Sequence, residues 1–320
     1  MAIILADMKV GLSDKVAQHV VDTFLRHSEI LQMLPFDNCV SPTGGSTLTY
    51  SYIQKKLPSM AAFRALNTEY AAGDAKLESK HVDLKVFGGA FEIDRVLKAA
   101  EGPYNNMAYQ MKEKILAAIS LFHHTLINGD ATTNANEFDG LDKMLAGTTT
   151  EYNAAGVLDI SSVENLKANA DQFYEMLQIM IADTGADALL CNNRTIAKIQ
   201  TLARILGYKT ETEEAFGKKV TTMDGVRLMD LGDHYTVSGN TATANNCVKV
   251  TEGKTDIYAV KFDVNDGFHG ATLTGNGVIH QYLPDFNAPG AVKRGEVEMT
   301  GAVVLKNTKH AGVLRNVKIG

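Results

Sequence analysis

The chain has little cysteine and proline and no tryptophan. Its three cysteines, Cys39, Cys191 and Cys247, lie far apart and form no CxxC pair, which is typical of a protein kept in a reducing cytoplasm. No run of about 18 apolar residues is present, so we expect no membrane-spanning helix and no membrane partner. The apolar start is short, is interrupted by Asp7 and follows no basic region, so we expect no secretory signal peptide.

Sequence motifs of common enzymes are also missing. No GxGxxG follows a predicted strand, and neither HExxH nor GxSxG occurs. Residues 248–255 resemble half of a phosphate-binding loop, but Val248 replaces the first glycine that the motif requires, so a turn between strands is expected there. Catalytic triads also assemble from distant residues, which a motif search does not detect.

Two groups of residues are candidate metal ligands. His123 and His124 are neighbours on a predicted helix and point about 100° apart, so they cannot chelate one ion from one face. A cluster of oxygen-bearing side chains lacks the spacing of a calcium-binding EF-hand, and a solvated loop is expected; it comprises Asp130, Asn134, Asn136 and Asp139. His269 and His280 are expected to be surface imidazoles. We therefore predict that the chain is not an enzyme and has no catalytic, cofactor-binding or metal-binding residue and no cofactor. A hydrolase with metal at Asp130–Asp139 is the contrasting hypothesis.

Charge is distributed unevenly along the chain, whose net charge is −6. Residues 46–90 contain six Lys/Arg and four Asp/Glu, residues 150–234 contain eight and thirteen, and residues 293–320 contain six and two. Two explanations of this pattern remain open. One is chance variation along the surface, and the other is contact between a basic patch and an acidic patch of identical subunits. The negative net charge of the whole chain does not favour tight binding of nucleic acid.

A long β-hairpin is predicted over residues 46–90. The segment 42–46 contains Pro and two Gly and breaks the chain, and apolar and polar residues then alternate on two short stretches. More than twenty residues separate these stretches, a length that a compact domain rarely carries without a use for it. The apolar side chains would form one face that needs a cover from a neighbouring subunit. We predict this assembly interface to comprise Leu48, Tyr50, Tyr52, Val82, Leu84 and Val86.

The rest of the pattern predicts a long helix and an α/β lobe. An amphipathic helix is expected over 11–34, a bend or bulge at Gly88-Gly89, and a long helix over 103–128 that Asn128-Gly129 ends in a left-handed cap. Four signals indicate the lobe. A capping box at Ser161 and Glu164 starts a helix that runs through Met180, and a buried strand follows at Ala188–Cys191. A second helix is capped by Asn192 or Asn193 and ends at Gly207, and Asp224-Gly225 forms a hairpin turn. A strand around 297–305, broken by Gly301, and a last strand at 313–319 end the chain.

The order of these parts resembles the HK97-type capsid subunit of tailed bacteriophages. The similar stretches are Gly88–Val96, Leu126–Asp130, Phe138–Leu141, Ile257–Phe262 and Arg294–Val304. The resemblance implies an α+β fold of four parts. These are an N-terminal arm (1–45), an extended loop (46–90), a peripheral domain (91–140 and 286–320, with the spine helix at 103–128) and an axial domain (141–285).

The resemblance also implies a function. The chain would be a major capsid protein that self-assembles into homo-pentamers and homo-hexamers of an icosahedral phage head around double-stranded DNA, which it would contact without sequence preference. The expected partners are a portal, a separate scaffolding protein or protease, and in some relatives a decoration protein. Assembly would take place in the bacterial cytoplasm, and the product would be the virion capsid. A Lys–Asn crosslink, as in some relatives, has candidate residues in Lys55, Lys56, Lys76 and Asn307. The alternative is an encapsulin, a bacterial compartment shell of the same fold.

Overall fold

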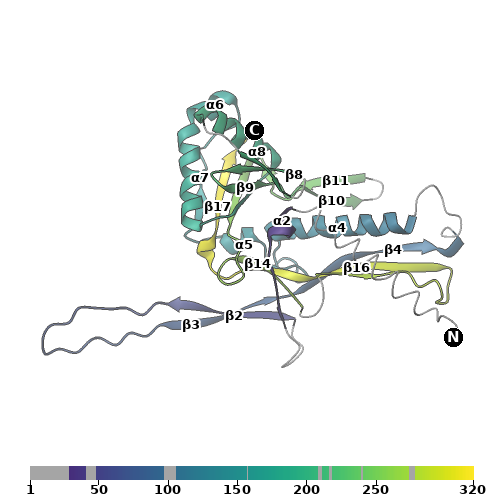
Figure 1. Cartoon of the computed structure of the whole chain (residues 1–320), viewed down its shortest axis with the longest axis horizontal. Coiled ribbons are helices and arrows are strands. Elements are labelled where there is room, and N and C mark those ends of the chain that lie inside the picture. The colour runs from purple at the N-terminus through teal and green to yellow at the C-terminus, as the bar shows by residue number, and fades with distance from the viewer. Residues whose placement is uncertain are drawn as a thin grey trace.

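The computed structural model describes residues 29–40, 48–96, 106–156, 158–207, 211–215, 218–238, 241–273 and 278–320. Figure 1 shows three parts: a lobe, an elongated body built on a long helix, and a hairpin that extends away from both. Of the helix predicted over 11–34, only the end lies within the described residues, as α2 (Glu29–Met33). The predicted break at 42–46 and the start of the long helix at Pro103 lie outside them.

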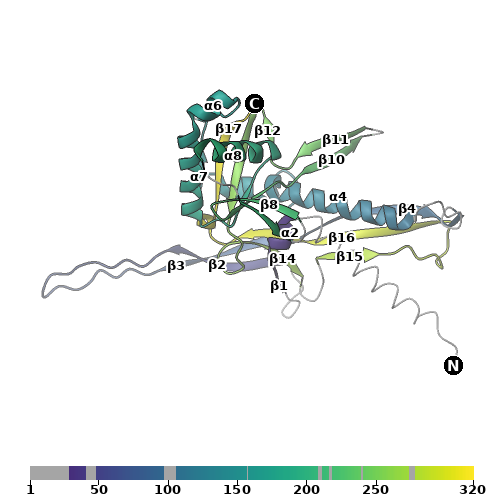
Figure 2. The same cartoon turned by 45° about the horizontal axis from the view of Figure 1, so that its top comes forward.

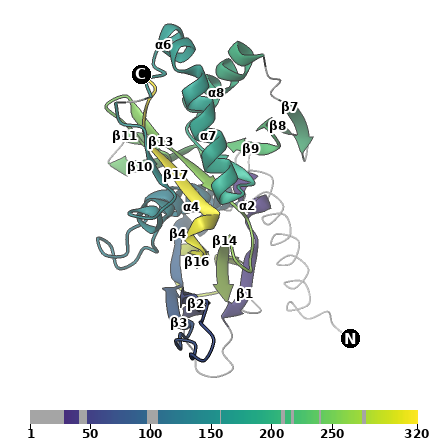
Figure 3. The same ribbon diagram turned by 90° about the vertical axis from the view of Figure 1, so that its left-hand side faces the viewer.

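The lobe is built on an eight-stranded mixed sheet. Its strand order is β5-β17-β13-β6-β9-β8-β7, and the short β12 pairs with the first two residues of β13. The strands are β5 (Glu151–Asn153), β6 (Ala188–Leu190), β7 (Glu211–Ala215), β8 (Lys218–Met223), β9 (Val226–Met229), β12 (Val250–Thr251), β13 (Lys254–Val260) and β17 (Ala311–Lys318). The helices α6 (Val163–Ala168), α7 (Ala170–Thr184) and α8 (Asn193–Leu206) complete the lobe, as Figure 3 shows. Phe173 and Leu177 of α7 are buried in one core with Ile257 and Leu314 of the sheet.

Local signals in the lobe were predicted with small errors. Gly207 ends α8 with φ +79°, and Asp224 and Gly225 form the β8–β9 turn with φ +52° and +81°, as predicted. Asn192 caps α8 by accepting a hydrogen bond from Arg194 N. The predicted cap at Ser161 is wrong by one residue, because Ser162 accepts from Asn165 N while the Ser161 hydroxyl bonds to Asp159. The predicted single helix is two helices, which meet at Asn169.

The body surrounds strand β16 (Val292–Leu305). β4 (Lys85–Asp94) pairs along one side of β16, and β15 (Ile279–Tyr282) and β14 (Phe268–Leu273) pair in turn along the other. The strand β1 (Phe36–Val40) extends this sheet beside β14. Helix α4 (Asn106–Asn128) packs on β4 and β16, and Figure 2 shows it running alongside them. α5 (Leu141–Leu145) and η1 (Thr308–His310) lie between body and lobe along the chain.

Three glycines have roles that differ from those predicted. Gly88 makes no bend but lies within β4, where an added Cβ would lie 1.9 Å from Val297 O of the paired strand. Gly129 does not have a left-handed conformation; an added Cβ there would lie 2.2 Å from Phe138 O. Gly301 does not break its strand, since β16 continues through it. At Gly88 and Gly129 the glycine provides room for a neighbouring backbone.

The sheets divide the chain differently from the predicted ranges. The last strand, β17, pairs with β13 and β5 in the lobe, although residues 286–320 were expected in the peripheral domain. β14 and β15 pair with β16 in the body, although residues 141–285 were expected in the axial domain. The chain therefore passes between the two parts more often than the linear ranges imply, because strand pairing depends on tertiary contacts that the sequence pattern does not specify.

The extended hairpin consists of β2 (Thr49–Leu57) and β3 (Lys76–Asp83), paired antiparallel from Thr49–Asp83 outward. A second two-stranded hairpin, β10 (Asp233–Ser238) and β11 (Thr241–Asn246), lies beside α4 (Figure 1). Leu84 separates β3 from β4, and its N–H donates to Leu48 O (2.6 Å). The stretch predicted as one strand therefore pairs first with β2 and then with β16.

Candidate assembly surface

The base of the β2–β3 hairpin is attached to the body by side chains of β2. Tyr50 Oη donates to Asp37 Oδ2 (2.8 Å), and His269 Nε2 lies 3.3 Å from the same hydroxyl. Tyr52 Oη donates to Leu305 O (3.3 Å), and burial raises the pKa of Tyr52 while Lys80 lowers it. Gln54 Nε2 donates to Lys306 O (2.9 Å). The base of the hairpin is thus part of the subunit's own fold.

The six residues predicted as one uncovered apolar face fall into three groups. Tyr50 and Leu84 are buried in the chain's own core, so for these two the prediction of an uncovered face is wrong. Tyr52 and Val82 are half-buried against that core. Leu48 and Val86 are exposed. The physical reason is that the base of β2 contacts β1, and Tyr50 of β2 packs against His269 of β14, so the body itself covers the face there. Whether any of the six contacts a neighbouring subunit stays a prediction.

The outer part of the hairpin carries apolar side chains that the sequence pattern did not single out. We call residues 58–75 the hairpin tip. Within it, Met60 is 85%, Leu66 is 89% and Tyr70 is 63% exposed, and Phe63 is fully exposed. On the strands below it, Ile53, Leu57 and Leu77 are also exposed. Met60, Phe63, Leu66 and Tyr70 recur every three or four residues, which is the spacing of a helix face, yet residues 58–75 form no helix. Sequence reasoning missed this spacing, which was one available signal beside the large apolar side chains themselves.

The tip has local polar structure of its own. Thr68 N and Oγ1 both donate to Ala65 O, and Asn67 has φ +65°. The Arg64 guanidinium lies 5.3 Å from the centre of the Tyr70 ring. On the strands, Glu78 accepts from Lys80 and pairs with Lys56; the hydrogen bond from Lys80 is the main cause of its lowered pKa. These exposed contacts shape the ribbon but leave the apolar side chains uncovered.

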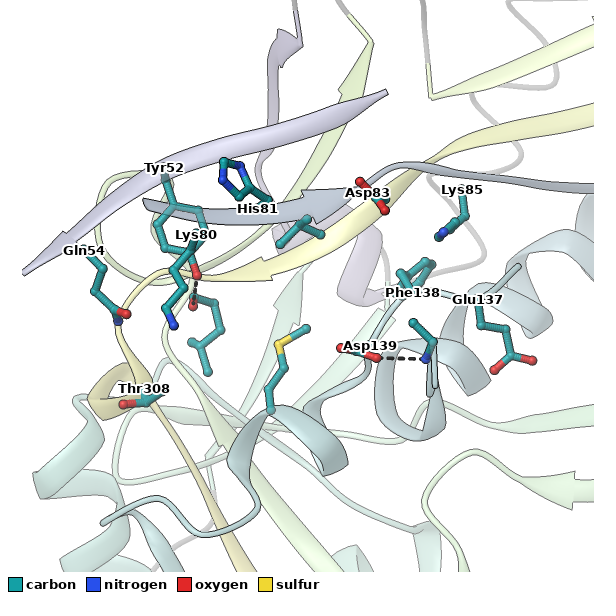
Figure 4. A pocket seen from close by; sticks show the side chains of 14 residues that line it. Tyr52, Gln54, Lys80, His81, Asp83, Lys85, Glu137, Phe138, Asp139 and Thr308 are labelled. Carbon is teal, nitrogen blue, oxygen red and sulfur yellow. Dashed lines mark hydrogen bonds between the residues drawn. The ribbon is translucent and has the colours of Figure 1, made fainter. Parts of the chain in front are cut away.

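A cleft of about 510 Å³ lies at the hairpin base, as Figure 4 shows. Its walls come from β2, β3 and the start of β4, from the turn after α4 and from α5, and from the end of β16 and the start of η1. Residues from sequence positions more than 200 apart meet there, such as Tyr52 and Thr308. Its charged lining residues are Lys80, Asp83, Lys85, Glu137 and Asp139. A sequence pattern gives no signal for such a cleft.

The oxygen cluster considered for calcium is occupied by a lysine. Lys143 Nζ bonds to Asp130 Oδ1 (2.5 Å) and to Asp139 Oδ1 (2.8 Å). Its hydrogen bond is the main cause that lowers the pKa of Asp130. Asn134 and Asn136 instead shape the turn, where Asn134 Oδ1 accepts from Asn136 N. Within the described residues, no group of three or more His, Cys, Asp or Glu side chains is arranged to hold a metal ion. The lysine ammonium supplies the positive charge at these oxygens.

The remaining candidate groups are parts of the fold. His123 is buried beside Leu231 O, and burial lowers its pKa to about 4. His269 was expected at the surface but is fully buried in β14, since its strand pairs inside the sheet. His280 is half-buried in β15. The half phosphate-binding loop is the β12–β13 turn, with positive φ at Glu252 and Gly253.

The two cysteines whose side chains are described, Cys191 and Cys247, are free and buried. Burial raises the pKa of the Cys247 thiol to about 12, which disfavours the reactive thiolate. Among the described helices, none combines the length and the hydropathy that a membrane span requires.

No family model matches the chain, and no curated protein matches it by sequence. Solved structures do match. The SrpI encapsulin from Synechococcus elongatus superposes with a TM-score of 0.60 at 12% identity, covering 90% of this chain and 87% of that one. A chain of Mycobacterium phage Ogopogo gives 0.57 at 13% identity, covering 90% and 91%.

The chain has the HK97-type capsid fold. The capsid of the native GTA particle supports the same assignment, with a TM-score of 0.55 at 10% identity and coverage of 90% and 89%. The predicted α+β class and capsid-type architecture are thereby confirmed. At identities of 10–13%, the similarity establishes the fold.

Proposed function

We propose that this chain is the major capsid protein of a tailed bacteriophage, which self-assembles into pentamers and hexamers of an icosahedral head around double-stranded DNA. The observation that carries the proposal is the hairpin tip, whose large apolar side chains are uncovered. A two-stranded ribbon is marginally stable alone in water. Each such side chain contributes about 1.5–3 kcal/mol when it is fully buried, which a neighbouring subunit would supply.

The shape of the subunit supports a ring or shell. The hairpin extends away from the body (Figure 1). Its tip can therefore bind a neighbouring subunit at a surface other than that subunit's own hairpin. Such a head-to-tail contact closes into rings when the rotation between copies divides a full turn. In this proposal the neighbour covers the tip, and the basic hairpin segment is steered toward the acidic segment 150–234.

The partners proposed for the shell are those expected of a phage head. They are a portal, a separate scaffolding protein or protease, a decoration protein in some heads, and packaged DNA. With a net charge of −6, the inner wall would contact DNA weakly and without sequence preference. The role of the chain is structural, with no reaction of its own.

An encapsulin shell is the second candidate, because the SrpI encapsulin and the phage and GTA capsid chains match at similar TM-scores. The test is to express the chain with its neighbouring genes and to examine purified particles by electron microscopy. Closed particles that protect double-stranded DNA from nuclease are expected. Closed particles that contain a co-purified protein and no DNA would favour the encapsulin. A chain that stays monomeric at high concentration, with and without those genes, would contradict both.

A further inference from the structure

Helix α4 meets the β10–β11 hairpin along a row of polar side chains. Ser120 Oγ donates to Asp233 O (2.9 Å), at the first residue of β10. One turn and two turns further along the helix, His124 and Asn128 lie on the same side. Asn128 Nδ2 donates to Cys247 O (2.7 Å), just beyond the end of β11. The base of the hairpin is therefore held on the helix by hydrogen bonds.

Two histidines face each other within this row. The ring centres of His124 on α4 and His234 on β10 are 5.2 Å apart. Both side chains are half-buried, and Ser120 Oγ lies 3.4 Å from His234 Nδ1. Two neutral imidazoles pack at this distance without charge repulsion. When both are protonated, two like charges lie together at a partly desolvated contact.

The outer part of the hairpin has little other attachment. Beyond His234 the strand side chains are exposed, with Tyr235 at 58% and Val237 at 72%. Across the ribbon they pair with Ala244 and Ala242, which are exposed as well. A change at the base therefore acts on the whole hairpin.

The charges around the pair favour release in acid. Burial is the first cause of the lowered pKa of His124, followed by His234 and by Lys249 beyond β11, while Glu137 in the turn after α4 opposes them. Asp233 and Asp230 lie near the hairpin base, and burial raises the pKa of Asp230. Acid thus adds positive charge to the histidines while it tends to neutralise Asp230.

We propose that His124 and His234 form an acid-sensitive latch, which holds the β10–β11 hairpin on the long helix at neutral pH and releases it near pH 5. The latch stands apart from the proposed shell function, because it is built from residues of one chain. Since the pKa of His124 is lowered in the closed state, the closed state is fully favoured above about pH 6.5 and weakens as pH falls below it.

The test is hydrogen–deuterium exchange of the full-length protein between pH 7 and pH 5, read as protection factors corrected for intrinsic rates. In the wild type we expect the amides of 233–246 to lose about tenfold in protection, the effect of adding one unfavourable charge contact. His234→Gln removes one of the two charges and should keep protection nearly constant. His81→Gln, which changes an exposed histidine on β3, serves as the matched control and should respond as the wild type does.

Three outcomes would overturn the latch. The first is unchanged protection of the hairpin in the wild type. The second is an equal loss in wild type and His234→Gln. The third is a loss shared by β13, since this would show general acid unfolding. Burial lowers the pKa of the neighbouring His123 to about 4, so this residue contributes less than the His124–His234 pair over the tested range. The comparison of wild type with His234→Gln separates the pair from the other histidines.

Discussion

The base and the tip of the β2–β3 hairpin belong to one ribbon and have opposite surroundings. At the base, Tyr50 is 3% exposed and bonds to Asp37 within its own core. At the tip, Phe63 is fully exposed. The comparison teaches that one β-ribbon can contribute to the fold of its own chain at one end, where apolar side chains meet the body, and leave apolar surface uncovered at the other end, where we propose that a second chain binds.

Deletion of the tip tests this division most strongly. Joining Leu57 to Lys76 through an Asn-Gly turn removes residues 58–75 and keeps the anchored strands. We expect a soluble protein with circular dichroism and a cooperative melt close to wild type, but no closed particles by electron microscopy. An unfolded product would show that the tip packs within its own subunit, and intact shells would show that the tip is dispensable.

Substitution of the buried anchor should have the next largest effect, on stability. Tyr50→Ala leaves a cavity in the core and removes the hydrogen bond to Asp37, which we expect to lower the free energy of unfolding by about 3–5 kcal/mol. Phe63→Ala is the matched control and should change it by less than about 0.5 kcal/mol. Urea melts of both variants measure the difference. Equal destabilisation by the two changes would remove the distinction between base and tip.

A polar substitution at the tip should weaken assembly by a smaller factor. Phe63→Ser removes one apolar contact from the proposed interface, and we expect the protein concentration needed for assembly to rise about tenfold, or ~1.4 kcal/mol per contact. Light scattering against concentration measures this threshold. Glu69→Ser, at a polar position of the same tip, should leave it near the wild-type value. An unchanged threshold in Phe63→Ser would exclude this side chain from the interface.

Acidification should destabilise the base of the hairpin and leave the tip unaffected. We expect this effect to be the smallest of the four. Burial is the main cause that lowers the pKa of His269, which contacts Tyr50 Oη. Its contribution to stability is therefore complete above about pH 6.5 and declines as pH falls toward the lowered pKa. Urea melts at pH 7.5 and 5.5 should show a smaller acid loss in His269→Gln than in wild type. A loss of the same size in both would assign the effect to other groups.

Much of the fold was predictable from local pattern. The long helix, the hairpin strands, the Asp224-Gly225 turn and the end of α8 at Gly207 follow from rules that act over a few residues. The exposed tip was less accessible to prediction. Its apolar side chains have the spacing of a helix face but form no helix, whereas the alternating residues that did stand out include Tyr50 and Leu84, which the body covers.

The sequence by itself determined much of the local structure, such as the long helix, the hairpin strands and the Asp224-Gly225 turn, because hydrogen bonding and side-chain spacing within a segment decide these. Only the tertiary structure decided that β17 joins the lobe sheet, that Gly88 lies against Val297 and that Lys143 pairs with Asp130 and Asp139. Such contacts join residues that are far apart in the chain or depend on how a loop closes. Their free energy depends on where the backbones meet in space, which a one-dimensional pattern does not record.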